Sequence, residues 1–129
     1  MSAKKALIID DHPHNRLVLE QLLNLSHIES ISLPDLTNLA AILDDIGPVD
    51  MVFLDLEMPI LNGYQVLAII KQNHHYQSTH MIAYTVHISE VENVFDKGFD
   101  SFLGKPVSLE EFPQQILRIL QGESICYIP

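Results

Sequence analysis

Four short apolar runs in this sequence end in side chains suited to phosphoryl chemistry. Two carboxylates follow residues 6–9, one follows residues 51–54, a hydroxyl follows residues 81–84, and an ammonium closes the run around 102–103. These side chains belong to Asp10, Asp11, Asp55, Thr85 and Lys105. Ligands of open α/β sheets bind at the carboxyl ends of the strands, so we expect the five groups to share one small site.

Carboxylates that lie within a few ångströms of one another repel, and a cation is needed to hold them ionised together. Oxygen ligands on an open shelf suit Mg²⁺, which keeps several waters and leaves positions for phosphate oxygens. One aspartate can then attack phosphorus, while Mg²⁺ and an ammonium neutralise the developing charge. A lone aspartate at a strand end is a helix cap or a solvated loop residue in roughly four cases of five, so the prediction depends on the joint pattern.

Alternating strand and helix patterns are predicted to position these groups. Strands are predicted at residues 6–9, 28–33, 51–54, 81–84 and 102–103. The first, third and fourth runs are apolar on both faces, as in strands that helices cover on each side. Apolar residues at helical spacing fill each interval and follow the fifth run. The alternation predicts an α/β fold with a doubly wound, five-stranded parallel sheet and helices on both faces.

Local signals mark the starts of several helices. Asp35 is predicted to cap the second helix, and Asn62-Gly63 opens the third. Residues 89–92 (Ser-Glu-Val-Glu) and 108–111 (Ser-Leu-Glu-Glu) match capping boxes for the fourth and fifth helices. Pro113 then falls just beyond the first turn of the fifth helix, where an irregular start is expected.

Composition bounds the classes of function. The chain has 129 residues, 47% of them apolar, so residues 1–129 are expected to form one domain with no separate output domain. The formal net charge of −10 disfavours nucleic acid and anionic membranes as partners. The single cysteine, Cys126, excludes an internal disulfide. No apolar run has the length of a membrane span or a signal-peptide core, so a cytoplasmic location is expected.

The chain resembles the receiver domain of two-component response regulators, in its single-domain, chemotaxis-regulator form, over nearly its whole length. The matching pieces are Ile8-Ile-Asp-Asp11, Val52-Phe-Leu-Asp-Leu-Glu-Met-Pro59 with Gly63, Ala83-Tyr-Thr85, and Gly98-Phe-Asp-Ser-Phe-Leu-Gly-Lys-Pro106. Each piece is moderately specific, and in this order and spacing they are highly specific. The resemblance implies a flavodoxin-like fold with strand order 2-1-3-4-5.

The resemblance assigns a phosphoacceptor and a metal site. Asp55 matches the residue that accepts the phosphoryl group. Asp10 and Asp11 match the acidic pair that binds Mg²⁺, directly or through water. Glu57 stands at the position whose backbone carbonyl completes the metal site.

The resemblance also assigns the parts of a conformational switch. Thr85 and Lys105 match the switch hydroxyl and the lysine of the family, and Phe102 matches the aromatic switch position. The bond before Pro106 is similar to one that is usually cis. A phosphoryl group on Asp55 would draw Thr85 inward, and Phe102 would rotate into the vacated space.

The implied function is a phosphorylation-dependent switch rather than an enzyme with an external substrate. The phosphodonor would be a histidine kinase or a histidine phosphotransfer protein. The output would be contact with a downstream protein through the face made by the fourth helix, fifth strand and fifth helix.

Three positions and one segment stand apart from this pattern. Val86 replaces a common alanine, and its larger side chain is expected to slow hydrolysis of the phosphoryl group. Glu57 and His87 stand where dephosphorylation rates are often tuned. Residues 123–129 either pack back on the domain or form a docking segment, and Cys126 has no paired base that would make it a catalytic thiol.

Two other functions are open at this point. A Mg²⁺-dependent phosphatase or phosphotransferase of small molecules would use the same aspartyl-phosphate chemistry, and it would turn over a phosphate ester beyond one equivalent. A binding module independent of phosphorylation would keep its partner when Asp55 is changed to Asn.

Overall fold

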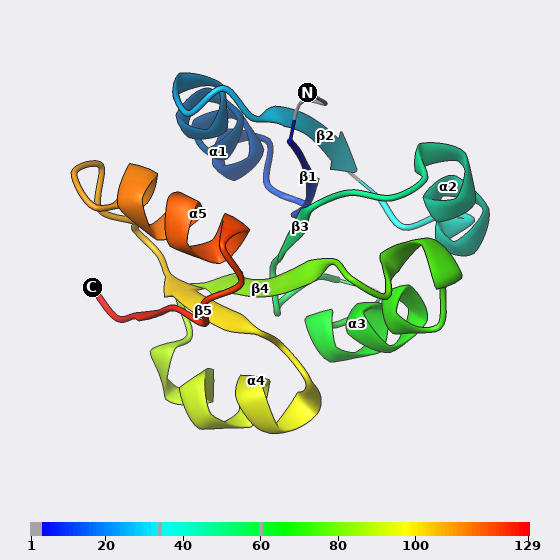
Figure 1. The fold of residues 1–129 in the computed structure, drawn as a ribbon. Coiled ribbons are helices and arrows are strands. Elements are labelled where there is room, and N and C mark those ends of the chain that lie inside the picture. Colours follow the sequence, from blue (N-terminus) through cyan, green and yellow to red (C-terminus); the bar gives the residue numbers. More distant parts are fainter. Residues whose placement is uncertain (1–3, 34, 60) are drawn as a thin grey trace.

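Strands and helices alternate along the computed structural model, which describes residues 4–33, 35–59 and 61–129 (Figure 1). The elements are β1 (Lys5–Ile9), α1 (Pro13–Leu25), β2 (Glu29–Leu33), α2 (Leu39–Ile46), β3 (Met51–Leu54), α3 (Gly63–Lys71), η1 (His74–Tyr76), β4 (His80–Thr85), η2 (Ile88–Glu90), α4 (Val91–Lys97), β5 (Ser101–Gly104), α5 (Phe112–Leu120) and β6 (Cys126–Tyr127). The five predicted strands and five predicted helices are all present.

The strands form one parallel sheet in the order β2-β1-β3-β4-β5-β6. The first five strands confirm the predicted order. The prediction of five strands was wrong by one, because residues 126–127 add a sixth strand beside β5. The strand has only two residues, and nothing in its sequence distinguishes it from an apolar loop.

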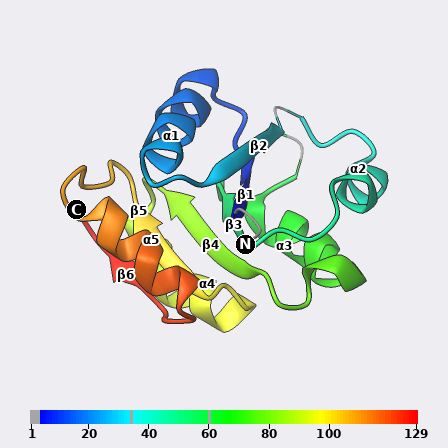
Figure 2. The ribbon, with the colours of Figure 1, turned by 45° about the horizontal axis from the view of Figure 1, so that its top comes forward.

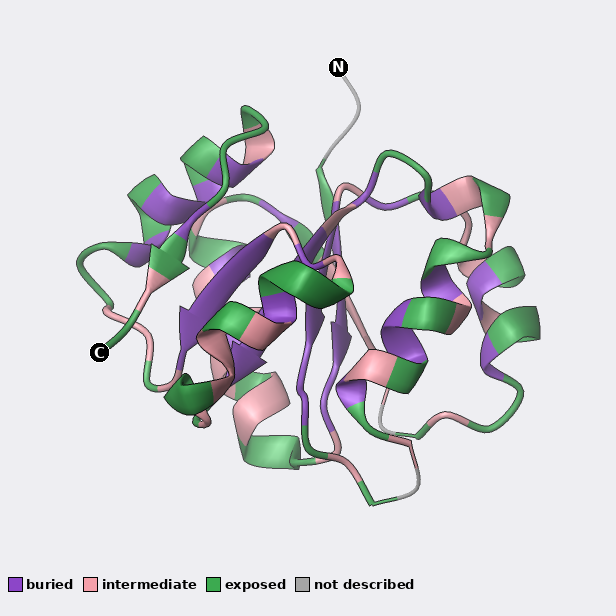
Figure 3. Cartoon of the chain, turned by 90° about the horizontal axis from the view of Figure 1, so that it is seen from below, coloured by how far each residue is buried: buried purple, intermediate pink, exposed green. Residues whose placement is uncertain are grey.

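Two apolar layers hold the sheet between the helices (Figures 1 and 2). Helices α1 and α5 cover one face and bury residues such as Leu23 and Ile116. Helices α2, α3 and α4 cover the other face, where Leu43, Val66 and Val94 are buried. Strands β3 and β4 are buried along almost their whole length, whereas the helices alternate buried and exposed residues (Figure 3). Burial on both faces explains why these strands contain apolar runs without alternation.

The helix starts confirm one local signal and correct two. Asn62 caps α3, since its side chain accepts from the Gln65 amide, and Gln65 reciprocates, in a capping box. Asp35 caps a turn instead of α2, because it accepts from the Thr37 amide and α2 begins only at Leu39. The predicted box at 89–92 is wrong: η2 occupies residues 88–90 and α4 begins at Val91 with no side-chain cap.

The fifth helix begins later than the sequence suggested. Ser108 Oγ accepts from the Glu111 amide at 3.2 Å, and α5 then runs from Phe112. Pro113 is therefore in the first turn, where a missing amide proton costs no helical hydrogen bond. Residues 109–111 form a turn before the helix, so the start is irregular as expected. Among the described residues, no helix combines the length and apolarity that a membrane crossing requires.

Candidate functional site

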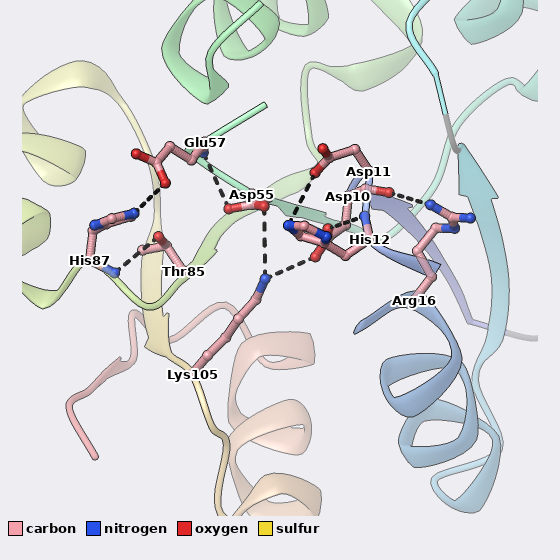
Figure 4. A network of polar contacts seen from close by, with 9 residues as sticks. All are labelled: Asp10, Asp11, His12, Arg16, Asp55, Glu57, Thr85, His87 and Lys105. Carbon is pink, nitrogen blue, oxygen red and sulfur yellow. Dashed lines mark hydrogen bonds and ion pairs between the residues drawn. The ribbon is translucent and has the colours of Figure 1, made fainter. Parts of the chain in front are cut away.

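Three strands bring charged side chains to one point at the carboxyl edge of the sheet (Figure 4). Asp10 follows β1, Asp55 follows β3 and Lys105 follows β5. Because β1 and β3 are paired neighbours, Asp10 and Asp55 lie side by side. Both aspartates are buried, with 2% and 6% of their surface exposed. Residues far apart in the chain thus form one enclosed charged cluster.

Lys105 supplies the positive charge of this cluster. Its Nζ donates to Asp10 Oδ2 at 2.9 Å and lies 3.9 Å from Asp55 Oδ2, and only 10% of its side chain is exposed. The Lys105–Pro106 peptide bond is cis. One ammonium therefore serves two buried carboxylates, and it lies closer to Asp10 than to Asp55.

Three carboxylates form a possible cation site. One oxygen each of Asp10, Asp11 and Asp55 can be chosen so that all three lie within 4.8 Å of one another. Asp11 Oδ1 is buried and makes no hydrogen bond to any described residue. His12 Nε2 lies 3.9 Å from this oxygen, too far for a hydrogen bond (Figure 4). A buried carboxylate oxygen without a hydrogen bond is costly, and a divalent cation that takes oxygen ligands would satisfy it. The residues present therefore fit a metal ion such as Mg²⁺.

The environment of Asp55 opposes its ionisation. Burial raises the pKa of Asp55, and the neighbouring charges of Asp10 and Asp11 raise it further. Lys105 acts in the opposite direction, as does the amide of Glu57, which donates to Asp55 Oδ1 at 3.3 Å. Asp55 is thus a carboxylate with few partners, which suits a nucleophile better than a structural ion pair.

Thr85, at the end of β4, lies beside this cluster, and Phe102 is on the neighbouring strand β5 (Figure 4). Thr85 is fully buried, and its Oγ1 accepts from the His87 amide at 3.2 Å. The ring of Phe102 is fully buried in the layer under α4. The ring of Phe102 is therefore already buried in this structure, so phosphorylation cannot rotate it from an exposed to a buried position.

Glu57 and His87 are joined by a hydrogen bond at the rim of the site. Glu57 Oε2 lies 2.7 Å from His87 Nε2, and both side chains are exposed. The Glu57 carboxylate thus turns toward His87, away from the three aspartates (Figure 4). Val86, between Thr85 and His87, is 61% exposed. Participation of the Glu57 backbone carbonyl in a metal site stays a prediction.

Sequence reasoning missed three contacts of the site. Arg16 Nη1 donates to the Asp10 carbonyl at 2.8 Å, and the His12 amide donates to Asp10 Oδ1 at 2.9 Å. Lys105 Nζ lies 4.6 Å from the ring centroid of Tyr84. Burial, with Asp10 and Asp55 nearby, raises the pKa of Tyr84 to about 12, so its hydroxyl stays neutral. Two features of the sequence could have indicated these contacts: Arg16, one turn into α1, and Tyr84, directly before Thr85.

Comparison with known proteins gives one family. Residues 6–117 match the family described as response regulator receiver domain. Protein PilG of Pseudomonas aeruginosa is 35% identical over 113 residues, which are 83% of this chain and 80% of PilG. Hybrid signal transduction histidine kinase A of Dictyostelium discoideum is 33% identical over 118 residues, 82% of this chain. The chain spans only 5% of that kinase, and only 14% of the histidine-protein kinase BarA of Escherichia coli, to which it is 28% identical.

Solved structures share the fold at lower identity. Chemotaxis protein CheY4 of Vibrio cholerae has a TM-score of 0.77 and 20% identity, covering 94% of this chain and 98% of that one. The receiver domain of a sensor histidine kinase from Pseudomonas aeruginosa, whose structure holds a magnesium ion coordinated in the active site cleft, has a TM-score of 0.75 and 24% identity, covering 94% and 97%. These matches lend no support to a small-molecule phosphatase.

Proposed function

The chain belongs to the family of response regulator receiver domains, the phosphoacceptor switches of two-component signalling, and from that premise we propose that Asp55 is its phosphoacceptor. The proposal rests mainly on one observation: Asp10, Asp11, Asp55 and Lys105 meet at one point of the carboxyl edge, where Asp10 and Asp55 are buried. The phosphodonor would be a histidine kinase or a histidine phosphotransfer protein in the cytoplasm.

The chemistry requires a free carboxylate oxygen on Asp55. One Asp55 oxygen attacks phosphorus, the new O–P bond forms as the P–N bond of phosphohistidine breaks, and the departing imidazole takes up a proton. Mg²⁺ held by Asp10, Asp11 and Asp55 would neutralise phosphoryl oxygens. Lys105 favours the ionised form of Asp55 before the attack, and it then donates to the phosphoryl group. Lys105 faces Oδ2 of Asp55, whereas the Glu57 amide faces Oδ1.

Phosphorylation shifts the population between two forms of the domain. The hydroxyl of Thr85 exchanges its bond with the His87 amide for one with the phosphoryl group, which moves the segment after β4. The face made by α4, β5 and α5 then binds a downstream protein. Charge-assisted hydrogen bonds to the phosphoryl group supply the energy of this shift.

Intact mass spectrometry tests the assignment of Asp55. The protein is incubated with Mg²⁺ and acetyl phosphate, and the expected product carries one phosphoryl group. Asp55→Asn should abolish this adduct, whereas Asp50→Asn, at the opposite edge of the sheet, should keep it. An adduct of undiminished yield on Asp55→Asn would contradict the proposal.

Self-catalysed loss of the phosphoryl group is the second part of the proposal. Val86 is exposed directly after Thr85, and Glu57 and His87 meet at the rim of the site, so we expect these three side chains to limit the access of water to Asp55. Val86→Ala widens this access and is expected to shorten the lifetime of the aspartyl phosphate, measured by decay of the mass adduct after the donor is removed. An unchanged lifetime would reject a role for Val86.

A further inference from the structure

The ammonium of Lys105 rests on the aromatic ring of Tyr84. Lys105 Nζ lies 4.6 Å from the ring centroid, and Tyr84 is only 5% exposed. The ring is itself held in place, since Phe53 meets it edge to face with centroids 6.1 Å apart. A buried, neutral aromatic face packed against Phe53 therefore lies under the only ammonium of the described site.

This contact restricts where the ammonium can go. Lys105 has a long flexible side chain, and its two carboxylate neighbours lie at unequal distances of 2.9 and 3.9 Å. A desolvated cation is attracted to an aromatic face without any formal negative charge. The ring thus stabilises the ammonium in reach of Asp55 and adds nothing to the repulsion among the three carboxylates.

We propose that Tyr84 is a positioning residue that holds Lys105 where it contacts the phosphoryl group on Asp55. This inference rests on the proposed function. Tyr84→Phe keeps the aromatic face, whereas Tyr84→Leu removes it and keeps an apolar side chain. The affinity for beryllofluoride with Mg²⁺, a mimic of the aspartyl phosphate, is measured by fluorine NMR of the bound complex.

Tyr84→Leu is expected to weaken the beryllofluoride complex about fivefold, and Tyr84→Phe to leave it near the wild-type value. In a Lys105→Met background, Tyr84→Leu should cause no further loss, because the ammonium is absent. A loss of equal size in both backgrounds, or equal losses for Phe and Leu, would show a general packing effect and overturn the inference. Failure of the wild type to bind beryllofluoride would instead reject the proposed function.

A separate observation concerns residues 123–129, which cover the free edge of β5. Cys126 pairs with Phe102 and Tyr127 with Leu103. The Phe102 amide donates to the Ile125 carbonyl at 2.8 Å, and the Ile125 amide donates to Ser101 Oγ at 2.9 Å. The Ile125 side chain is buried in the layer under α5. The segment therefore occupies part of the face proposed for the downstream protein.

The same segment lies near Ile88, which follows Thr85 by three residues, because both border Gly104 at the end of β5. A Cβ on Gly104 would lie 2.6 Å from Pro129 Cδ, 3.2 Å from the Tyr127 carbonyl oxygen and 3.4 Å from Ile88 Cγ2. Pro129 and Ile88 thus both lie close to Gly104, the residue directly before Lys105. A displacement of the segment after Thr85 would act on Pro129.

The attachment of this segment is weak enough to be reversible. One buried side chain and a two-residue strand oppose the entropy of ordering seven residues. A groove lies between α5 and residues 124–127. Gln115 lines it from α5, and its Oε1 is buried and makes no hydrogen bond to the described residues. The structure assigns residues 123–129 as an intramolecular cover of the β5 edge that phosphorylation of Asp55 releases, freeing the edge for the partner.

Hydrogen exchange of the full chain tests this cover. With Mg²⁺ and beryllofluoride bound, the amides of residues 123–129 and of Phe102 are expected to exchange about tenfold faster. By reciprocity, Ile125→Ser should raise the affinity for beryllofluoride by a similar factor, whereas Cys126→Ser, whose side chain is exposed, should not. Ser101→Ala removes the acceptor of the Ile125 amide and provides a second detached variant.

Unchanged or slower exchange in residues 123–129, with beryllofluoride binding verified by fluorine NMR in the same sample, would overturn this second inference. Equal affinities for Ile125→Ser and wild type would do the same. Absence of bound beryllofluoride would reject the proposed function and with it the cover.

Discussion

The two edges of the parallel sheet use aspartates for different purposes. At the amino edge, Asp50 directly precedes β3 and Asp100 directly precedes β5. Asp50 Oδ2 accepts from the Lys5 amide, and Asp100 Oδ2 accepts from the Met81 amide, both at 2.8 Å. These carboxylates complete the first hydrogen bonds between neighbouring strands.

The aspartates of the two edges accept from equal numbers of backbone amides, one each, and differ in what surrounds their remaining oxygens. Asp10 and Asp55 each have one oxygen that accepts from an amide two residues later. Their other oxygens share Lys105, and Asp11 Oδ1 has no hydrogen-bond partner among the described residues. The same residue type therefore stabilises the fold where one strand amide and solvent satisfy it, and becomes reactive where buried carboxylates share one ammonium.

The largest expected effect is on reactivity at the carboxyl edge. Lys105→Met removes the ammonium that faces the phosphoryl group, and phosphoryl uptake from acetyl phosphate should fall about 100-fold. Lys5→Met, at the amino edge, should leave uptake unchanged. Intact mass over time measures both rates, and equal rates for the two variants would erase the distinction between the edges.

The second effect is on stability at the amino edge. Asp100→Ala leaves the Met81 amide without its acceptor and should lower the free energy of unfolding by about 2 kcal/mol. Asp96→Ala, an exposed position on α4, should change it by less than about 0.5 kcal/mol. Urea denaturation provides the comparison, and a loss at Asp96 as large as that at Asp100 would refute it.

The third effect is on stability at the carboxyl edge, where removing the charge of an aspartate should raise the free energy of unfolding instead of lowering it. The pKa of Asp55 is raised in the folded state, so folding favours its protonated form, and stability falls as the pH rises through the folded-state pKa. Without divalent cations at pH 7, Asp55→Asn should therefore raise the free energy of unfolding by on the order of 1 kcal/mol. It should also flatten the pH dependence above the ordinary pKa of 3.8. A destabilised Asp55→Asn would show that Asp55 is a structural residue.

The smallest effect concerns His80, which begins β4 and whose Nε2 lies 2.7 Å from Ser101 Oγ. Burial lowers the pKa of His80, so the unfolded chain binds its proton more tightly. Stability should fall as the pH drops below 6.5, the ordinary value, toward the folded-state pKa. His80→Gln should lose this dependence, measured by urea denaturation between pH 7.5 and 5.5; an identical pH profile would contradict it.

Much of the site followed from local patterns, and some of the fold did not. The strand ends at Asp10, Asp55 and Lys105 were predicted within one or two residues, because buried parallel strands leave long apolar runs. The box at 89–92 failed, since a short 3₁₀ turn satisfies the same sequence before α4 begins. Local hydrogen-bonding motifs compete closely with such turns, and packing decides between them.

Alternating apolar runs and helix signals, read without coordinates, determined that one edge of a parallel sheet would carry three aspartates, a threonine and a lysine. Packing in three dimensions places Lys105 on Tyr84, buries Phe102 and makes residues 126–127 a sixth strand, and none of these features was predictable from the sequence. The reason is physical. The parallel direction of the strands follows from the order of the elements, whereas the position of a long side chain or of a two-residue strand depends on surfaces contributed by distant segments.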